Sequence, residues 1–156
     1  AFNYLYLKDK SMLSLEKLLF VLNHLAVSDA EGYFKKIGYV LESSNDGRWL
    51  FTKKIKADRA DVISLEQADT GFNSISHISA EDKNFSSIFD DAISKFGFEV
   101  LENNRITTLL GTKHFDLFLM RHNYPPFKSF STRLKRVNKD KENFVIEVIL
   151  NPPPQS

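Results

Sequence analysis

The sequence predicts an α+β protein in which helices pack on one face of an antiparallel sheet. Two stretches of helical periodicity that end at glycine each precede a run of short strand-like segments. The first run contains a tight-turn signal, which is typical of antiparallel hairpins. With 42% hydrophobic and 13% aromatic residues, the 156-residue chain can bury a core between helices and sheet.

The first expected helix has its leucines on one face. Leu15, Leu18 and Leu22 recur at helical spacing. Ser14 directly precedes them, and its hydroxyl can accept a free backbone N–H at the helix start. These residues predict a helix that begins after Ser14.

A second helix is expected from Ser28 to Ile37. Ser28 and Glu31 have the spacing of a capping box, in which each side chain accepts a backbone N–H at the helix start. Gly38 is expected to end this helix, because glycine adopts the left-handed conformation without steric cost.

Four strand-like segments follow, at 39–43, 48–54, 61–67 and 72–79. Asn45-Asp46-Gly47 predicts a tight hairpin, since Asp-Gly suits the positive φ angles of such a turn. Gly71 indicates another turn, and the charged stretch 53–61 is interpreted as a longer hairpin loop. Trp49 and Phe51 share one strand face, either as core under a helix or as anchors on an open face.

The pattern then repeats. Apolar residues keep helical spacing over 85–96, and Gly97 is expected to end this helix. The strand-like segments of this half are 98–102, 105–112, 114–122 and 143–150. We therefore expect an internally duplicated α-β-β-β-β unit, with Gly38-Tyr39 in register with Gly97-Phe98. The halves are 1–79 and 80–156, joined in one structural unit.

Composition removes several classes of function. There is no cysteine, which excludes disulfides, thiolate nucleophiles and cysteine-bound zinc. The net charge is only +1, which argues against a general nucleic-acid binder. The six glycines form no phosphate-binding loop. No apolar run is long enough for a membrane span, and we expect no cofactor.

His114, Asp116 and His122 are the one candidate set for catalysis or metal binding. Alternate residues of a strand project from the same face, so these side chains share one. A hydrolase or metal enzyme is therefore an alternative function. The competing interpretation is a polar outer face on a half-buried strand, which we favour because no nucleophile or oxyanion hole accompanies the set. No catalytic and no metal-ligating residue is assigned.

The segment 124–141 mixes basic and aromatic residues. Its cations suit phosphates and its aromatics suit stacking on bases, which makes nucleic-acid binding an alternative function. It can also be a long solvated hairpin or loop pinned by its aromatics, or a partner-binding loop, since Tyr, Phe and Arg are common in protein interfaces. The candidate binding residues are Tyr124, Phe127, Phe130, Arg133, Lys135 and Arg136.

The leucine-rich helix at 14–19, Gly38-Tyr39 and Lys95-Phe96-Gly97-Phe98 resemble motifs in a loose set of small bacterial proteins of unknown role, many of them exported. The layout is also similar to inhibitors of the β-lactamase-inhibitor type, in which tandem helix-plus-four-strand units grip another protein with a concave sheet. Those inhibitors carry disulfides, which this chain cannot form.

The resemblance and the missing catalytic motifs together favour a non-enzymatic protein-binding module, inhibitory or immunity-like, whose partner is an unknown protein. An exported location is favoured over the cytoplasm.

Overall fold

A computed structural model describes residues 13–80, 83–124 and 127–137. Within these ranges the helical elements are α2 (Leu15–His24), the short 3₁₀ helix η1 (Val27–Asp29), α3 (Ala30–Lys36) and α4 (Lys83–Ser94). The strands are β1 (Val40–Asn45), β2 (Arg48–Lys56), β3 (Arg59–Ala68), β4 (Gly71–Ser79), β5 (Glu99–Asn103), β6 (Thr107–Gly111), β7 (Phe115–Tyr124) and β8 (Phe127–Arg136).

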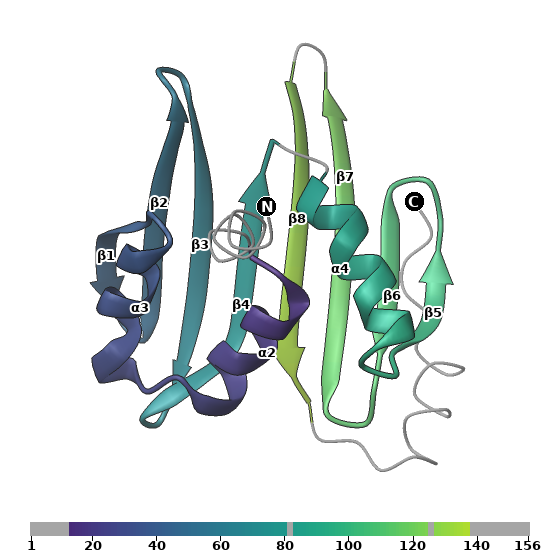
Figure 1. The fold of residues 1–156 in the computed structure, drawn as a ribbon, viewed down its shortest axis with the longest axis horizontal. Coiled ribbons are helices and arrows are strands. Elements are labelled where there is room, and N and C mark those ends of the chain that lie inside the picture. Colours follow the sequence, from purple (N-terminus) through teal and green to yellow (C-terminus); the bar gives the residue numbers. More distant parts are fainter. Residues whose placement is uncertain (1–12, 81–82, 125–126, 138–156) are drawn as a thin grey trace, which may run out of the picture.

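The eight strands form a single sheet of order β1-β2-β3-β4-β8-β7-β6-β5. Every neighbouring pair is antiparallel. The sheet therefore consists of two four-stranded meanders, and their last strands, β4 and β8, lie side by side at its centre (Figure 1). The predicted α+β class with an antiparallel sheet is confirmed.

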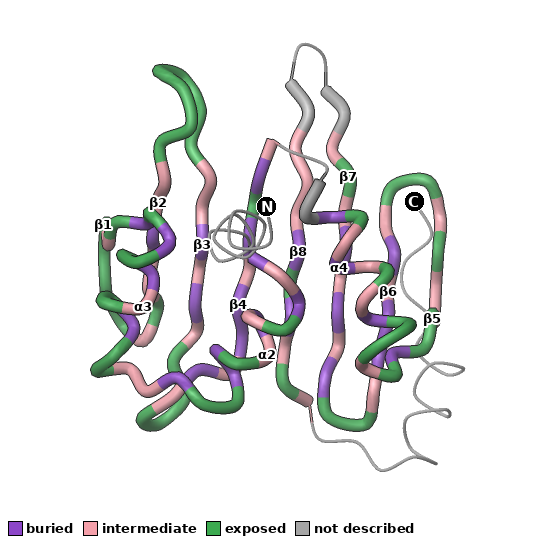
Figure 2. The backbone as a smooth tube through the Cα atoms, in the orientation of Figure 1, coloured by how far each residue is buried: buried purple, intermediate pink, exposed green. Residues whose placement is uncertain are grey.

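The helices α2, α3 and α4 lie in front of the sheet in Figure 1. Their apolar residues and alternate strand residues form the core, in which Leu18, Phe34, Phe51 and Ile88 are at most 1% exposed. The rings of Phe34 on α3 and Phe51 on β2 have centroids 4.7 Å apart. Phe51 is thus core under a helix. Figure 2 shows the buried stretches along the strands and the exposed tip of the β2–β3 hairpin.

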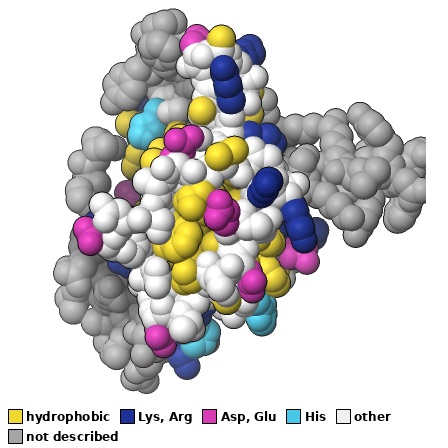
Figure 3. Space-filling view, turned by 90° about the vertical axis from the view of Figure 1, so that its left-hand side faces the viewer, with side chains coloured by type: hydrophobic (Ala, Val, Ile, Leu, Met, Phe, Trp, Pro, Cys, Tyr) yellow, Lys and Arg dark blue, Asp and Glu magenta, His cyan; other side chains and the backbone are white. Residues whose placement is uncertain are grey.

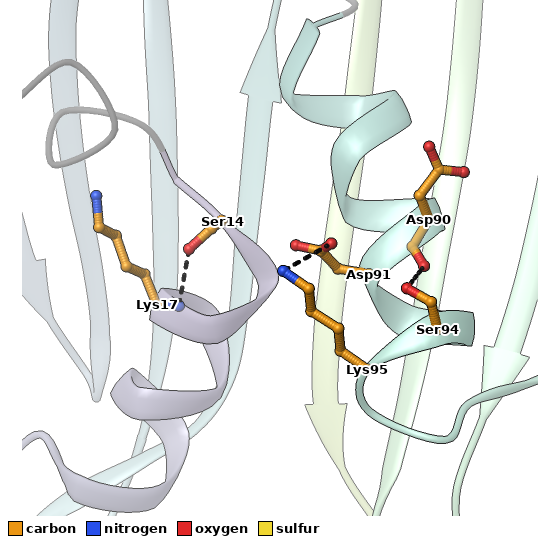
Figure 4. Close-up of polar contacts among 6 residues, drawn as sticks. All are labelled: Ser14, Lys17, Asp90, Asp91, Ser94 and Lys95. Atoms are coloured by element: carbon orange, nitrogen blue, oxygen red, sulfur yellow. Dashed lines mark hydrogen bonds and ion pairs between the residues drawn. The ribbon is translucent and has the colours of Figure 1, made fainter. Parts of the chain in front are cut away.

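Helix α2 starts as the sequence predicts. The Ser14 hydroxyl accepts the backbone N–H of Lys17 at 3.3 Å (Figure 4). On α4, the Ser94 hydroxyl donates to the Asp90 carbonyl at 2.7 Å. Lys95, just beyond the helix, forms an ion pair with Asp91 at 3.6 Å, also drawn in Figure 4.

The predicted capping box at Ser28 is wrong. The chain makes a 3₁₀ turn over Val27–Asp29, so α3 starts only at Ala30. Asp29 is its N-cap residue and forms no side-chain capping bond. Ser28 lies inside the turn instead of preceding the helix. The turn is fixed by a tertiary contact, because the Val27 N–H donates to the Thr70 carbonyl at 2.8 Å.

The Asp46-Gly47 hairpin is confirmed, with φ angles of 53° and 77°. The longer loop predicted over 53–61 is wrong, since β2 and β3 continue to Lys56 and Arg59 and only two residues connect them. Pairing there needs no burial, because backbone hydrogen bonds hold the protruding hairpin while its charged side chains stay in water.

The strand β8 is the largest departure from the sequence prediction. Residues 127–136 form the second strand of the β7–β8 hairpin and also pair with β4. The interpretation of this stretch as a loop is therefore wrong, whereas a hairpin is formed. The fourth strand expected for this half, 143–150, lies outside the described residues.

The edges of the two meanders pair with one constant offset. Leu41 and Phe51 are partners in the first meander, and Val100 and Leu110, each 59 residues later, are partners in the second. Each edge strand also has one register shift at the same place, over Glu42 and Leu101. The sequence triplets Val40-Leu41-Glu42 and Val100-Leu101-Glu102 are therefore not structural counterparts, because their positions are one residue out of step with this offset.

The pairing of β4 with β8, here called the central joint, relates the two meanders symmetrically. Following the pairs across each meander makes His77 the counterpart of Leu134 and Ile75 the counterpart of Thr132. At the joint Ile75 pairs with Leu134 and His77 pairs with Thr132. Exchanging the two meanders therefore exchanges these two pairs.

Two glycines of the first half should respond oppositely to alanine. Gly38 ends α3 with a φ of +94°, and an added Cβ would lie 3.0 Å from the side chain of Lys53. We expect Gly38→Ala to lower the free energy of unfolding by about 1–2 kcal/mol, the cost of a left-handed non-glycine residue. Gly32 lies inside α3 with open space around it, so Gly32→Ala should raise stability by about 0.5–1 kcal/mol. Urea denaturation of both variants measures the difference, and equal effects would contradict the assigned conformations.

Candidate binding surface

The sheet surface opposite the helices, here called the open face, is built from two rows of side chains that follow the strand register. The first row is Val40, Thr52, Val62, Ile78, Ser131, Met120 and Thr107. The second row is Ser43, Leu50, Ser64, Ser76, Arg133, Phe118, Leu109 and Glu102. Both rows cross the joint between β4 and β8, so the surface belongs to both meanders.

These rows are only partly covered, unlike the core rows behind them. Val40 is 64% exposed and Ile78 is 44% exposed, whereas Ile63 and Ile75 of the core face are fully buried. Most other apolar members, such as Phe118, are half-buried. The open face thus mixes aliphatic and aromatic side chains with serine and threonine hydroxyls. Large exposed apolar patches of this kind mark interaction sites more often than inert surface.

The apolar surface continues to the β1 edge. Figure 3 shows this side of the molecule, where apolar side chains gather in the middle with an acidic side chain among them and basic ones to the right. Val40 on β1 is the most exposed large apolar residue among the described ones. The centre of a protein interface is its most apolar part, so exposed apolar surface of this kind favours such a role.

A depression of about 330 Å³ lies at the centre of the open face. Ser76 and Ile78 come from β4, Phe118 and Met120 from β7, and the β8 residues between them complete it. Its small members are Ser131, which lies between Ile78 and Met120 in the first row, and Ser76, which lies between Ser64 and Arg133 in the second. The β8 residues that line it are Ser131, Thr132 and Arg133.

Two of the basic and aromatic residues singled out in the sequence belong to the core face. The ring of Phe130 lies 5.3 Å from that of Phe85 on α4. The Arg136 guanidinium donates to the Leu22 carbonyl and, at 2.8 Å, to Oδ1 of Asn23. These two side chains therefore join β8 to the helices.

Arg133 and Lys135 lie on the open face, opposite Ser76 and Ser74 of β4. Tyr124 and Phe127 pair where the β7–β8 hairpin closes. The candidate residues thus do not share one surface: the cations of the open face are separated by the sheet from Phe130 and Arg136. A continuous platform of cations and stacking rings is not formed by these four residues.

The set of His114, Asp116 and His122 does not converge. His114 lies in the turn before β7, and Asp116 and His122 are separated on that strand by Phe118 and Met120. Six residues of strand span about 20 Å, too far for a shared metal ion or proton. Leu117 and Leu119, which alternate with these positions along β7, are fully buried. Within the described ranges no three His, Asp or Glu side chains could hold a metal ion.

A buried polar cluster, which sequence reasoning missed, links Tyr39, the residue before β1, to β3 and β4 on the core face. The Tyr39 hydroxyl lies 3.1 Å from Nε2 of His77, and Oδ2 of Asp61 lies 3.6 Å from the same nitrogen. Tyr39 and His77 are 4% and 3% exposed. Burial raises the pKa of Tyr39 well above its usual range, and the Asp61 carboxylate raises it further. Because solvent barely reaches Tyr39 and His77, the role of these contacts is structural: they provide hydrogen-bond partners for buried polar groups.

The local signal for this cluster is weak. His77 follows Ile75 by two residues on β4, so the two side chains share one face of the strand. This places His77 on the core face once the inner side of β4 is known. Its partners Tyr39 and Asp61 are distant in sequence, so only the sheet register brings the three together.

Comparisons with known protein families, with curated proteins and with solved structures find no match to this chain. None of the helices in the described part of the chain is long and apolar enough to cross a membrane.

Proposed function

We propose that the chain is a non-enzymatic protein-binding module, inhibitory or immunity-like, that engages its partner through the open face. The observation that carries this proposal is the pair of half-exposed rows that crosses β1 to β6, on the opposite side of the sheet from the described helices of Figure 1. Val40 and Ile78 on these rows offer apolar area to a partner, and neighbouring hydroxyls offer hydrogen bonds.

The test compares matched lysine substitutions on opposite sides of the molecule. Val40→Lys and Ile78→Lys place a charge on the open face, where the side chains are 64% and 44% exposed. Ile93→Lys places the same charge on α4 at a position that is 46% exposed. Because all three sites are accessible, each variant should keep its fold, which circular dichroism and thermal unfolding check.

The chain and its variants are then used as bait in extracts of the source cells. We expect a partner that is retained by the wild-type chain and by Ile93→Lys, and that binds at least about tenfold more weakly to Val40→Lys and Ile78→Lys. Recovery of no stable partner, or equal retention by all four baits, would overturn the proposal.

We further propose that the two meanders arose by internal duplication. The constant offset of 59 residues at their edges and the exchangeable pairs at the β4–β8 joint support it. The first half alone, residues 13–80, should then self-associate, with Ile75 of one copy opposite His77 of the other. Sedimentation equilibrium measures this. If the fragment assembles only with the second half and never with itself, the symmetry of the joint does not reflect duplication.

A further inference from the structure

The central depression of the open face has a defined chemistry. Ile78, Phe118 and Met120 form its apolar walls, and Arg133 contributes the one cation among the described residues that line it. Ser76 and Ser131 are its small members, and they make room for a guest side chain. Ser131 lies between Ile78 and Met120 across the strands, and Ser76 lies between Ser64 and Arg133. Its volume of about 330 Å³ is at the lower end of ligand sites, which suits a single large side chain.

Arg133 is loosely held. Its guanidinium lies 3.9 Å from Oε1 of Glu66, and the two side chains are 44% and 41% exposed. Ion pairs this long and this exposed contribute little to stability, so a second carboxylate can replace or join Glu66 at low cost. A bidentate contact from a partner's carboxylate is stronger, because both guanidinium donors then point at the same group.

We propose that the depression receives one large apolar side chain of a protein partner, and that a carboxylate next to that side chain pairs with Arg133. This inference rests on the proposed function and names the chemistry of its partner. Apolar anchors that fill a central pocket carry much of the energy of protein interfaces, while a neighbouring charge fixes the register. The site lies on the β4–β8 joint, where both meanders contribute to it.

The test selects ligands from a display library of random linear peptides on the immobilised full chain. We expect enrichment of a large apolar residue next to Asp or Glu. Arg133→Glu should shift the enriched charge to Lys or Arg. Ser131→Tyr, which fills the hollow, should weaken the selected wild-type peptides at least about tenfold. Lys95→Glu, at a site 67% exposed near α4, is the matched control and should leave the selection unchanged.

Two results of the selection would overturn the inference: no enrichment at all, or enrichment of peptides without an apolar–acidic pair. Binding of the selected peptides to Arg133→Glu and Ser131→Tyr as tightly as to the wild-type chain would overturn it as well. The outcome is separable from the proposed function, since Val40 lies outside the depression. If Val40→Lys weakens the captured partner while Arg133→Glu and Ser131→Tyr do not, the open face binds but the depression does not. If none of the open-face variants weakens it, the proposed function fails as well.

Discussion

Replacing Phe51 by alanine should lower the free energy of unfolding by about 3–5 kcal/mol, the usual range for a fully buried phenylalanine. Phe51 is fully buried, and its ring packs on the equally buried ring of Phe34. Truncation removes apolar area and leaves a cavity between α3 and β2, which rigid backbone elements cannot close. Such a loss is a large part of the stability of an ordinary domain, about 5–15 kcal/mol.

Two further variants keep this prediction measurable. Phe51→Leu preserves most of the volume and should cost less than about 1.5 kcal/mol. Phe20 on α2 is 42% exposed and stacks on Tyr33, so Phe20→Ala should cost below about 1 kcal/mol. Urea unfolding of the three proteins gives the order. If Phe20→Ala destabilised as much as Phe51→Ala, the assignment of the core to the interface of α3 and β2 would be wrong.

Local chemistry made much of the first half predictable. The leucine stripe after Ser14, the Asp-Gly turn and the positive φ of Gly38 each depend on residues next to one another in sequence. Ser28 and the β2–β3 hairpin were mispredicted for a different reason. The contact of Val27 with Thr70 fixes the turn that contains Ser28, and backbone pairing extends β2 and β3. Neither leaves a local pattern.

The error at β8 has a clear cause. Phe130, Thr132 and Leu134 face the core and Arg133 and Lys135 face outward, which is the alternation of a half-buried strand. The many cations of this segment mask its period of two, because a solvated loop carries the same charges. A strand can be strongly basic when only its outer face carries the charge.

The open face could not be assembled from the sequence. Ile78, Ser131 and Met120 meet there because β4 pairs with β8 and β8 with β7. Residue patterns predicted strands and a free sheet face, but strand order depends on pairing between distant segments. The depression and its arginine follow from that order alone.

Raising the pH above about 10 should destabilise the wild-type chain more steeply than Tyr39→Phe. The pKa of Tyr39 is raised by burial and then by the Asp61 carboxylate. In the unfolded chain the phenol ionises near its ordinary value of about 10, whereas in the folded chain it stays neutral. The neutral form is therefore fully stabilising below that pH. As the pH rises toward the folded value, the advantage is lost at about 1.4 kcal/mol per unit.

At neutral pH, Tyr39→Phe should itself cost about 1–3 kcal/mol, because His77 loses its hydroxyl partner at a position with 3% exposure. The stabilities of wild type and variant should hence begin to converge above about pH 10 and meet at about pH 11–12 in urea unfolding. Burial also raises the pKa of Tyr33, but that residue is present in both proteins and cancels in the comparison. Asp61→Asn removes one cause of the raised Tyr39 pKa. The stability advantage of Asp61→Asn over the double variant Asp61→Asn/Tyr39→Phe should therefore stop falling at a lower pH than in the wild-type background. Parallel stability curves would mean that the Tyr39 phenol ionises as freely in the folded chain as in the unfolded one, and would contradict the raised pKa of the buried phenol.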